Sequence, residues 1–500
     1  MRTRWPRRLI PLALLGIVAA GCGRGAAAPA PPEPRPVNGG TLVYALPADP
    51  VSVTPLYGGD AAGLVIERNV FAGLVDADPS TLRTVPVIAR SWSSTPDART
   101  YTFRLRPHVS FPGGAGAVTA ATFAADWRLL CSPGVASPNA AVLEPVSGYA
   151  ACASGSGTLS GVRATGPLTL VVQLSRPVKD FPSMLVDPAT WAFPPQLAAT
   201  ADDRAAFERA PVGAGPFRLV SLRKSTHPAG KAAVAGLAVL SRNPNYFGVR
   251  PHLDRVEMPV VAGADAGSIA AYRAGRYQVL PLPAAEVDVV RADPEFGRQL
   301  LDTPRLSLIS LQRRPGATSS LVGGLSASQV TELAAGKSGQ AADALVPLGM
   351  PGYVPNVAHA GPAPVTGETV TLTRPTGATE TSFTSAVARV LRSDGAQVRV
   401  VPHGDWTVSE LNLQSAAPAT VVAALAGRGQ ASLVSQVEAA PPAAVGRTLI
   451  HAQQALLAGG AIVPLAFGQT QLLIAPGVRG LLVDALGAPR LAGAWLTTSH

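Results

Sequence analysis

The sequence predicts a mixed α/β protein made of more than one folded unit, and three observations carry this prediction. The chain has 500 residues, which exceeds the size of one compact core. Its 50 glycines and 48 prolines require many turns between short elements, which favours mixed strands and helices over a helical bundle. Segments in which apolar and polar residues alternate, typical of strands, are interleaved with segments of helical spacing.

The predicted elements of the folded body begin at residue 39 and alternate in a regular order. Residues 39–46 (GGTLVYAL) predict a strand behind a glycine pair, and residues 61–76 have apolar residues near helical spacing. Residues 99–106 (RTYTFRLR) alternate cleanly and predict a sheet strand. Residues 118–131 (VTAATFAADWRLLC) predict a helix with Thr119 as its N-cap.

A hairpin is predicted near the middle of the chain. Gly213 and Pro216 mark a tight turn into it, since glycine permits positive φ and proline fixes its own φ. Residues 217–222 (FRLVSL) and 237–241 (LAVLS) then have the pattern of two strands. We expect this hairpin to be the last part of one lobe before the chain crosses into another.

The second half predicts further strand–helix units. Residues 368–375 form a predicted strand, residues 383–391 carry one apolar helical face, and residues 397–401 form the next strand. A strand–helix–strand unit implies parallel pairing. Residues 447–460 predict another helix, and residues 462–467 (IVPLAF) lead back from it as a strand.

The N-terminus has the pattern of a secretion signal. Residues 1–21 combine an arginine-rich start with an apolar run at 9–18 that is too short to span a bilayer, and small residues precede Cys22. The run AAGC resembles a bacterial lipobox, which predicts lipid on Cys22 and, at 22–37, a Pro/Ala-rich tether. The alternative is ordinary cleavage that leaves a soluble secreted protein.

Two more cysteines remain for the folded body. Cys131 and Cys152 form an even pair in an exported protein, which predicts a disulfide. Closing a loop of this size would stabilise the fold by roughly 3 kcal/mol. The alternative is two buried free thiols.

The charge and the short motifs exclude several function classes. The formal charge is +10, but the arginines are scattered and no basic–aromatic cluster predicts nucleic-acid binding. No GxSxG or HExxH occurs, and the histidines lack the spacing of metal ligands. Residues 335–338 (AGKS) lack the first glycine of a phosphate loop, because Thr331 stands in its place. We therefore expect no enzyme activity, no cofactor and no metal.

An ordered series of motifs resembles one protein family. The series contains GGTLVYALPADPVSVTPLY, NVFAGLV, VPVIARSW, RTYTFRLRPHVSF and VTAATFAADW, and later PVGAGPFRL, LSRNPNYFG and HLDRV. It resembles the extracellular solute-binding proteins of the peptide-binding family, family 5. These are the oligopeptide- and dipeptide-binding lipoproteins of ATP-driven (ABC) importers.

The resemblance implies a particular domain organisation. The family has a two-lobed periplasmic-binding-protein-like fold, of type II or Venus-flytrap form, with an extra subdomain inserted in lobe I. Lobe I would then be residues 38–262, with the inserted subdomain at about 76–192. Lobe II would be residues 263–460, and residues 461–500 would return to lobe I.

The second half departs from the family pattern in two places. Residues 306–339 preserve almost none of the family's asparagine-containing strand and acidic–arginine helix. Trp406 in HGDW is not followed by the carboxylate cluster that holds a peptide's amino terminus in the family. Binding-protein architecture is therefore expected, with a peptide as the default ligand and other small solutes left open.

The resemblance also implies which loops face the cleft between the lobes. Polar groups at strand ends can converge there on a solute without disturbing the core. Asp60 and Asn139 have turn or cap roles as their alternative, and Trp191 and Phe467 have core roles as theirs. The residues expected to contact ligand are Tyr57, Asp60, Asn139, Asp187, Trp191, Phe467 and Gln469, with Trp406 from the second lobe.

The predicted function is solute capture. The protein would bind a peptide or similar small solute in the interlobe cleft and deliver it to the membrane permease of an ABC importer. It would act as a monomer, anchored through Cys22 on the outer face of the cytoplasmic membrane. The alternatives are an envelope lipoprotein that keeps the scaffold as a sensor or interaction protein, and a secreted hydrolase.

Overall fold

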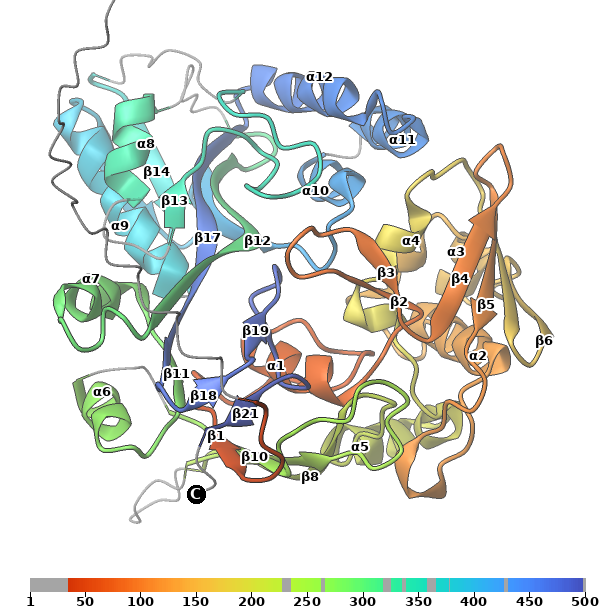
Figure 1. The fold of residues 1–500 in the computed structure, drawn as a ribbon. Helices are drawn as coiled ribbons and strands as arrows, with labels where there is room; N and C mark the ends of the chain where they lie inside the picture. The colour runs from red at the N-terminus through yellow and green to blue at the C-terminus, as the bar shows by residue number, and fades with distance from the viewer. Residues whose placement is uncertain are drawn as a thin grey trace, which may run out of the picture. The chain divides into compact units, whose positions relative to one another are not determined.

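Three β-sheets of four or more strands organise the part of the chain that the structure describes (Figure 1). This computed structural model describes residues 35–226, 235–261, 266–317, 325–334, 339–357, 366–376, 378–426 and 430–497. The described residues from Pro36 onward belong to one unit. The mixed α/β class predicted from the sequence is confirmed.

The first sheet contains the predicted central hairpin. Its order is β1-β10-β9-β8, with β1 parallel to β10 and the other neighbours antiparallel. Its strands are β1 (Thr41–Val43), β8 (Phe217–Arg223), β9 (Leu237–Arg242) and β10 (Arg255–Pro259).

The glycines before this hairpin have a role different from the predicted one. Neither Gly213 nor Gly215 has a positive φ. A Cβ on Gly213 would lie 2.2 Å from the Val70 carbonyl oxygen, and the Gly215 N–H donates to that same oxygen at 2.8 Å. The two glycines are therefore required by close packing against the end of a helix rather than by backbone conformation.

Another four-stranded sheet, antiparallel throughout, lies within the segment expected to be inserted. Its order is β4-β5-β7-β6, and the short hairpin β2-β3 precedes it. The predicted alternation in β5 is confirmed, because Tyr101, Phe103 and Leu105 are buried. The strands are β2 (Val75–Ala77), β3 (Thr84–Pro86), β4 (Ala89–Ser94), β5 (Thr100–Leu105), β6 (Val162–Gly166) and β7 (Thr169–Gln173).

Helix α2 (Ala120–Cys131) packs against this sheet. Its predicted N-cap is confirmed: Thr119 and Thr122 form a capping box. The predicted Cys131–Cys152 disulfide is also present and joins α2 to a short helix, α3 (Tyr149–Ala153). The other helical segments of the first half are α1 (Ala61–Val70), α4 (Phe181–Met184), α5 (Ala201–Arg209) and the 3-10 turns Pro112–Gly114, Ala140–Leu143, Pro188–Thr190 and Pro195–Ala198.

The sheet of the second half of the chain has seven strands. Its order is β11-β17-β12-β16-β14-β15, and β13 pairs with β17. The predicted parallel pair is confirmed, because β14 and β15 run parallel and α9 connects them. The strands are β11 (Val279–Pro281), β12 (Leu300–Arg313), β13 (Gly339–Ala341), β14 (Thr369–Thr373), β15 (Gln397–Val401), β16 (Trp406–Asn412) and β17 (Ile462–Ile474).

Strand β17 bears on the expected domain organisation. Residues 461–500 were expected to return to the first lobe, but β17 pairs with β12 along most of its length and with β11 at its end. The chain returns to α1 only afterwards, where the Asn69 side chain bonds the backbone of Pro489 and Leu491. A strand held by ladders on both sides belongs to the sheet that contains those ladders.

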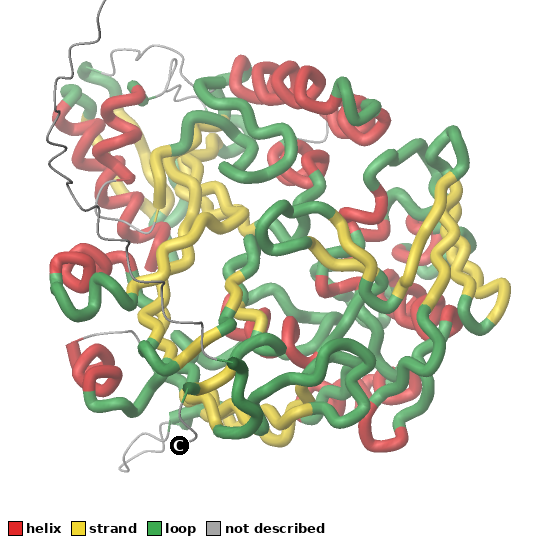
Figure 2. Tube along the Cα trace, in the orientation of Figure 1, coloured by secondary structure: helices red, strands yellow, loops and turns green. Residues whose placement is uncertain are grey.

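Helices pack against this sheet and against one another (Figure 2). α8 and α9 pack against the sheet, and α10, α11 and α12 form a separate group that reaches β17 through α12. The helices of the second half are α6 (Ala266–Arg273), α7 (Ala284–Ala292), α8 (Ala327–Ala334), α9 (Ala378–Ser393), α10 (Pro418–Leu425), α11 (Ala431–Ala439) and α12 (Val445–Ala458).

The first sheet and the seven-stranded sheet meet where the chain crosses between them. Tyr44, just after β1, forms a parallel bridge with Val279 in β11. The Gln278 side chain reinforces this junction by accepting a hydrogen bond from the Val43 N–H at 2.6 Å. This pair of contacts joins the first sheet to the second one close to the crossing predicted after the central hairpin.

Several predictions concern residues outside the described part of the chain. The signal segment 1–21, the lipidation residue Cys22 and most of the tether at 22–37 lie there. Within the described residues, no helix is both long and apolar enough to span a membrane. The same residues contain no group of three or more His, Cys, Asp or Glu side chains that could hold a metal ion.

Candidate functional site

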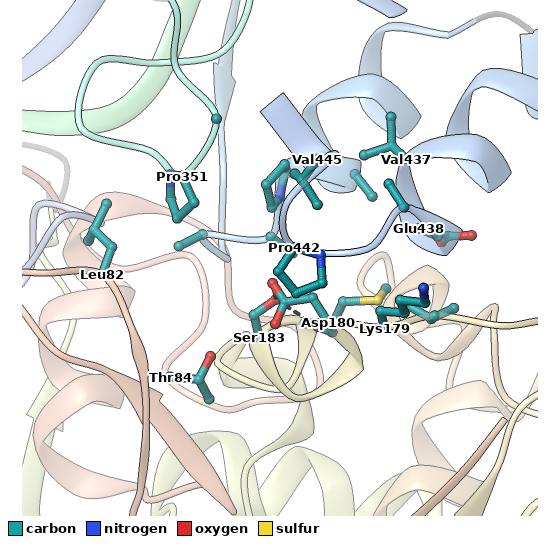
Figure 3. A pocket seen from close by; sticks show the side chains of 18 of the residues that line it. Leu82, Thr84, Lys179, Asp180, Ser183, Pro351, Val437, Glu438, Pro442 and Val445 are labelled. Atoms are coloured by element: carbon teal, nitrogen blue, oxygen red, sulfur yellow. Dashed lines mark hydrogen bonds between the residues drawn. The ribbon is translucent and has the colours of Figure 1, made fainter. Parts of the chain in front are cut away.

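A cavity of about 590 Å³ lies between segments that are far apart in the sequence. One side, here named the N-terminal wall, consists of residues 82–84 from the β2–β3 hairpin and residues 178–184 around α4. The opposite side, the C-terminal wall, consists of residues 351–352, 416–419 and residues from 437 to 446. Figure 3 shows side chains from both walls pointing toward the space between them.

Proline and alanine dominate the C-terminal wall for a local structural reason. Pro418 is the first residue of α10, where its missing N–H costs no helical hydrogen bond. Pro442 lies in the short turn between α11 and α12, and Pro351 lies in a loop that also lines the cavity. These residues present carbon surface with little side-chain freedom, so this wall is apolar and rigid.

Polar contacts cross from one wall to the other. Arg176 donates from Nε to Glu438 Oε2 at 2.6 Å and from Nη2 to Glu438 Oε1 at 3.0 Å. The Lys179 N–H donates to the Glu438 carbonyl at 2.9 Å, and the Ser415 hydroxyl donates to the Ser183 carbonyl at 2.7 Å. Because each contact joins residues more than 230 positions apart, together they hold the two walls in this arrangement.

A second cavity, of about 270 Å³, adjoins the first and shares Met184, Ala419 and Glu438 with it. Two predicted site residues, Asn139 and Asp187, line this second cavity. Among the eight predicted ligand contacts, these two are the ones that the structure brings to either cavity.

Asn139 and Asp187 also have local structural roles. The Asn139 amide donates to the Gly58 carbonyl at 2.6 Å, which ties the two loops together. Asp187 caps a 3-10 turn by accepting from the Ala189 N–H at 2.9 Å. Burial raises the pKa of Asp187 to about 7, against the opposing effects of that hydrogen bond and of nearby Arg68.

Asp60 is a helix cap. Its Oδ1 accepts from the Gly63 N–H at 2.9 Å in the first turn of α1, and its Oδ2 accepts from the Val51 N–H at 3.0 Å. Both carboxylate oxygens are therefore used by the backbone, which is the alternative role considered for this residue. Tyr57 lies partly buried in the same loop and lines neither cavity.

The predicted aromatic contacts lie in the protein interior. Trp191 is buried beneath Arg68, whose guanidinium carbon is 4.9 Å from the ring centroid, and Phe467 is buried edge-on against Tyr353. Trp406 is 0% exposed, between strands β14 and β12. None of the three lines either cavity, and core packing is the alternative role considered for Trp191 and Phe467.

Gln469 is half-buried on β17, where its register partner is Pro304 on β12. It lines neither cavity. The strand position predicted for it is correct.

Sequence reasoning missed the residues that do line the larger cavity. Lys179, Ser183 and Glu438 lie there, as does Arg83 on the β2–β3 hairpin. One signal was available: Glu438 is the single carboxylate in a long stretch of small and apolar residues, 431–446. A lone acid in such a segment requires a partner when it is buried, and here the partner is Arg176.

Comparisons with known proteins agree with this architecture. Residues 83–322 match the family model of bacterial extracellular solute-binding proteins, family 5. The chain is 35% identical over 133 residues to the periplasmic oligopeptide-binding protein OppA of Escherichia coli, covering 26% of this chain and 24% of OppA. It is 25% identical over 270 residues to the dipeptide-binding protein DppE of Bacillus subtilis, covering 52% of this chain and 44% of DppE.

Solved structures extend the likeness over nearly the whole chain. The murein tripeptide binding protein MppA of Escherichia coli superimposes with a TM-score of 0.75, covering 92% of this chain and 99% of MppA. The sequence identity is 18%, so this likeness establishes the fold alone. It confirms the two-lobed fold that the sequence predicts. By sequence, the matched segments span less than half of either curated relative.

Proposed function

We propose that this chain, which belongs to family 5 of the bacterial extracellular solute-binding proteins, captures a peptide or similar small solute and delivers it to the permease of an ABC importer. The family is a peptide-binding family of such importers, and its members are binding proteins. In this proposal the solute occupies the cavity between the N-terminal wall and the C-terminal wall. Its binding would favour the arrangement in which the two walls approach each other.

One observation carries the proposal: the cavity of about 590 Å³ takes its lining from both halves of the chain. Its size falls in the range typical of pockets for small ligands, about 300–1,000 Å³. A solute held there would touch both walls at once, so its binding energy would depend on how they are arranged. A permease could then distinguish loaded from empty protein by that arrangement alone.

The domain boundaries enter the proposal in a modified form. Lobe I would comprise residues 38–262, including the inserted subdomain at about 76–192, and lobe II would begin at residue 263. Because β17 belongs to the second sheet, the return to lobe I would begin after Ile474 rather than at residue 461.

The membrane location is proposed from the N-terminal sequence. Lipid on Cys22 would hold the folded body at the outer face of the cytoplasmic membrane, and the Pro/Ala-rich tether would separate the two. Intact-mass measurement of protein from the membrane fraction tests this. A diacylglyceryl mass increment that is absent from Cys22→Ala supports the anchor, and an unmodified cysteine contradicts it.

Native mass spectrometry of protein purified gently from its host tests the binding function. We expect a co-purified solute of defined mass that is released by mild unfolding and rebinds after refolding. Small-angle scattering should then show a smaller radius of gyration for the loaded protein. Absence of any bound species, together with no change of dimensions on exposure to a peptide library and host metabolite extract, contradicts the proposal.

A further inference from the structure

The charged groups of the larger cavity are unequal in their availability to a solute. Among the described residues that line it, four carry charged side chains: Arg83, Lys179, Asp180 and Glu438. Two are bases and two are acids, so a count of charges predicts no preference. The preference appears only when the existing partners of each group are considered.

Glu438 is fully occupied, and Asp180 is occupied at one of its two oxygens. The Glu438 side chain is only 3% exposed, and each of its oxygens accepts a hydrogen bond from Arg176, which also pairs with Glu144. Asp180 is exposed; its Oδ2 accepts from the Ser183 hydroxyl at 2.6 Å, and its Oδ1 has no hydrogen bond among the described residues. Desolvation raises the pKa of Asp180, so the charged form of this carboxylate is less favourable than in water.

Both bases are unoccupied. Arg83 and Lys179 are exposed, and within the described chain neither side chain has a hydrogen bond or an ion pair. Only their backbone groups are engaged: Arg83 in the β2–β3 turn, and Lys179 with the Glu438 carbonyl. The backbone contact of Lys179 fixes its position beside the cavity, where Figure 3 shows its side chain.

The remainder of the lining is mainly carbon. Val178 and Met184 contribute it from the N-terminal wall, and Pro351, Ala417 and Val445 from the C-terminal wall. An apolar wall rewards an apolar body in the ligand, because its burial removes carbon surface from water. A ligand's carboxylate would meet a cation without a partner at Lys179 or at Arg83, whereas an ammonium group would meet only Asp180, one of whose oxygens already accepts a hydrogen bond.

We propose that the cavity selects an anionic solute, one with an apolar body and a carboxylate held by Lys179 and Arg83. The inference rests on the proposed binding function and narrows its ligand class. A peptide with a free amino terminus would bind less well than the same peptide with that terminus blocked. An N-blocked peptide acid and a fatty acid share the required chemistry, so the test includes both.

The test uses calorimetric titration of the whole folded protein with ligands that differ only in charge. The peptide probes share one dileucine body: the N-acetyl acid is an anion, the N-acetyl amide is neutral, and the free-amine amide is a cation. Decanoate supplies the non-peptide carboxylate. We expect the N-acetyl acid, decanoate or both to bind. The cation should bind at least about tenfold more weakly than the tighter of the two anions. A tenfold difference corresponds to about 1.4 kcal/mol, the size of one charged contact.

Two variants test the residues. Lys179→Met keeps the length and carbon of the side chain, and we expect it to weaken the anion about fivefold while leaving the neutral amide unchanged, as a single exposed charge pair would. Arg163→Met is the matched control, since Arg163 is an exposed, unpaired arginine on β6 that lines neither cavity. Thermal melting of each variant verifies its fold.

The outcomes separate this inference from the binding function. Preference for either anion, reduced by Lys179→Met and unaffected by Arg163→Met, supports the charge assignment, and the better anion identifies its source. Equal or tighter binding of the cation, or failure of both anions, overturns it. If a co-purified neutral or cationic solute is found, the binding function stands and the charge assignment fails.

Discussion

Two arginine networks in this protein join distant segments in contrasting environments. Arg68 on α1 contacts Asp76 at 2.9 Å and Asp484 at 2.7 Å, and its side chain is 2% exposed. Arg176, just before the N-terminal wall, contacts Glu438 of the C-terminal wall at 2.6 Å, and its side chain is 24% exposed. The first network ties α1 to the C-terminal segment, where Arg490 joins it, and the second ties the two walls together.

The contrast indicates which junction can open. Charges with little access to water separate only at a large desolvation cost. The Arg68 and Asp484 side chains are 2% and 3% exposed, so their contact acts as a permanent part of the fold. A partly exposed arginine can exchange its partner for water at little cost. The Arg176 contact is therefore suited to a cleft whose walls separate and approach, and four predictions test this difference.

The largest effect is expected at Arg68. Arg68→Met leaves Asp76 and Asp484 with only Arg490 as a partner in a buried site, so the free energy of unfolding should fall by about 3–5 kcal/mol. Urea denaturation followed by circular dichroism measures this. Arg163→Met serves as the control and should change stability by less than about 0.5 kcal/mol. A loss at Arg68 no larger than the control's would remove the distinction between the two networks.

The disulfide should give the next largest effect. Replacing Cys131 and Cys152 together by alanine releases a loop of sequence separation 21 and should cost about 3 kcal/mol, because the unfolded chain gains freedom. The change lies away from both cavities, so solute affinity should be unaffected once the protein is folded. Denaturation and titration of the same sample check both parts, and an altered affinity would mean that the inserted sheet participates in binding.

Asp187 predicts a dependence of stability on pH. Its pKa is raised from 3.8 to about 7 in the folded protein, so the folded state retains a proton that the unfolded state has lost. Its contribution to stability is complete below pH 4 and is lost as the pH rises through 7, with a slope of at most about 1.4 kcal/mol per unit.

Asp187→Asn isolates this contribution, since asparagine keeps the oxygen that caps the turn. Between pH 4 and pH 7, the unfolding free energy of the wild type should fall relative to that of Asp187→Asn. Glu67 adds to the same trend, because burial raises its pKa and the charges of neighbouring acids, Asp187 among them, raise it further. A difference that stays constant over this range would contradict the assignment.

The smallest effect on stability is expected at Arg176. Arg176→Met leaves the buried Glu438 carboxylate without its partner, and opening of the cleft would let water reach it. Global stability should therefore change by no more than about 1 kcal/mol, while the radius of gyration increases and solute affinity falls. A loss as large as that of Arg68→Met, with unchanged dimensions, would show that the Arg176 contact is a fixed part of the fold.

Local patterns predicted the fold better than the site. The alternation of β5 and the capping of α2 by Thr119 depend on residues adjacent in sequence, and both are confirmed. Strand β17 was recognised as a strand, but its sheet depends on pairing with β12 residues 150 or more positions away. Sequence periodicity carries no information about such partners.

The site was harder because its geometry depends on contacts between remote segments. Glu438 meets Arg176 across 262 positions, and nothing local to either residue indicates that pairing. Aromatic residues were chosen as ligand contacts at Trp191 and Trp406, yet both are buried. A tryptophan in a loop or at a strand start is compatible with a cleft or with a core, and only the packing of the whole chain decides between them.

Hydrogen–deuterium exchange with and without the co-purified solute tests the central claim, that a solute is held between the two walls. The account predicts slower exchange on both sides of the cavity, at residues 178–184 and at 416–419 and 437–446. Amides of α1 should show the same protection in both states, because the Arg68 network is fixed. Protection confined to one wall, or centred on segments that line neither cavity, would contradict it.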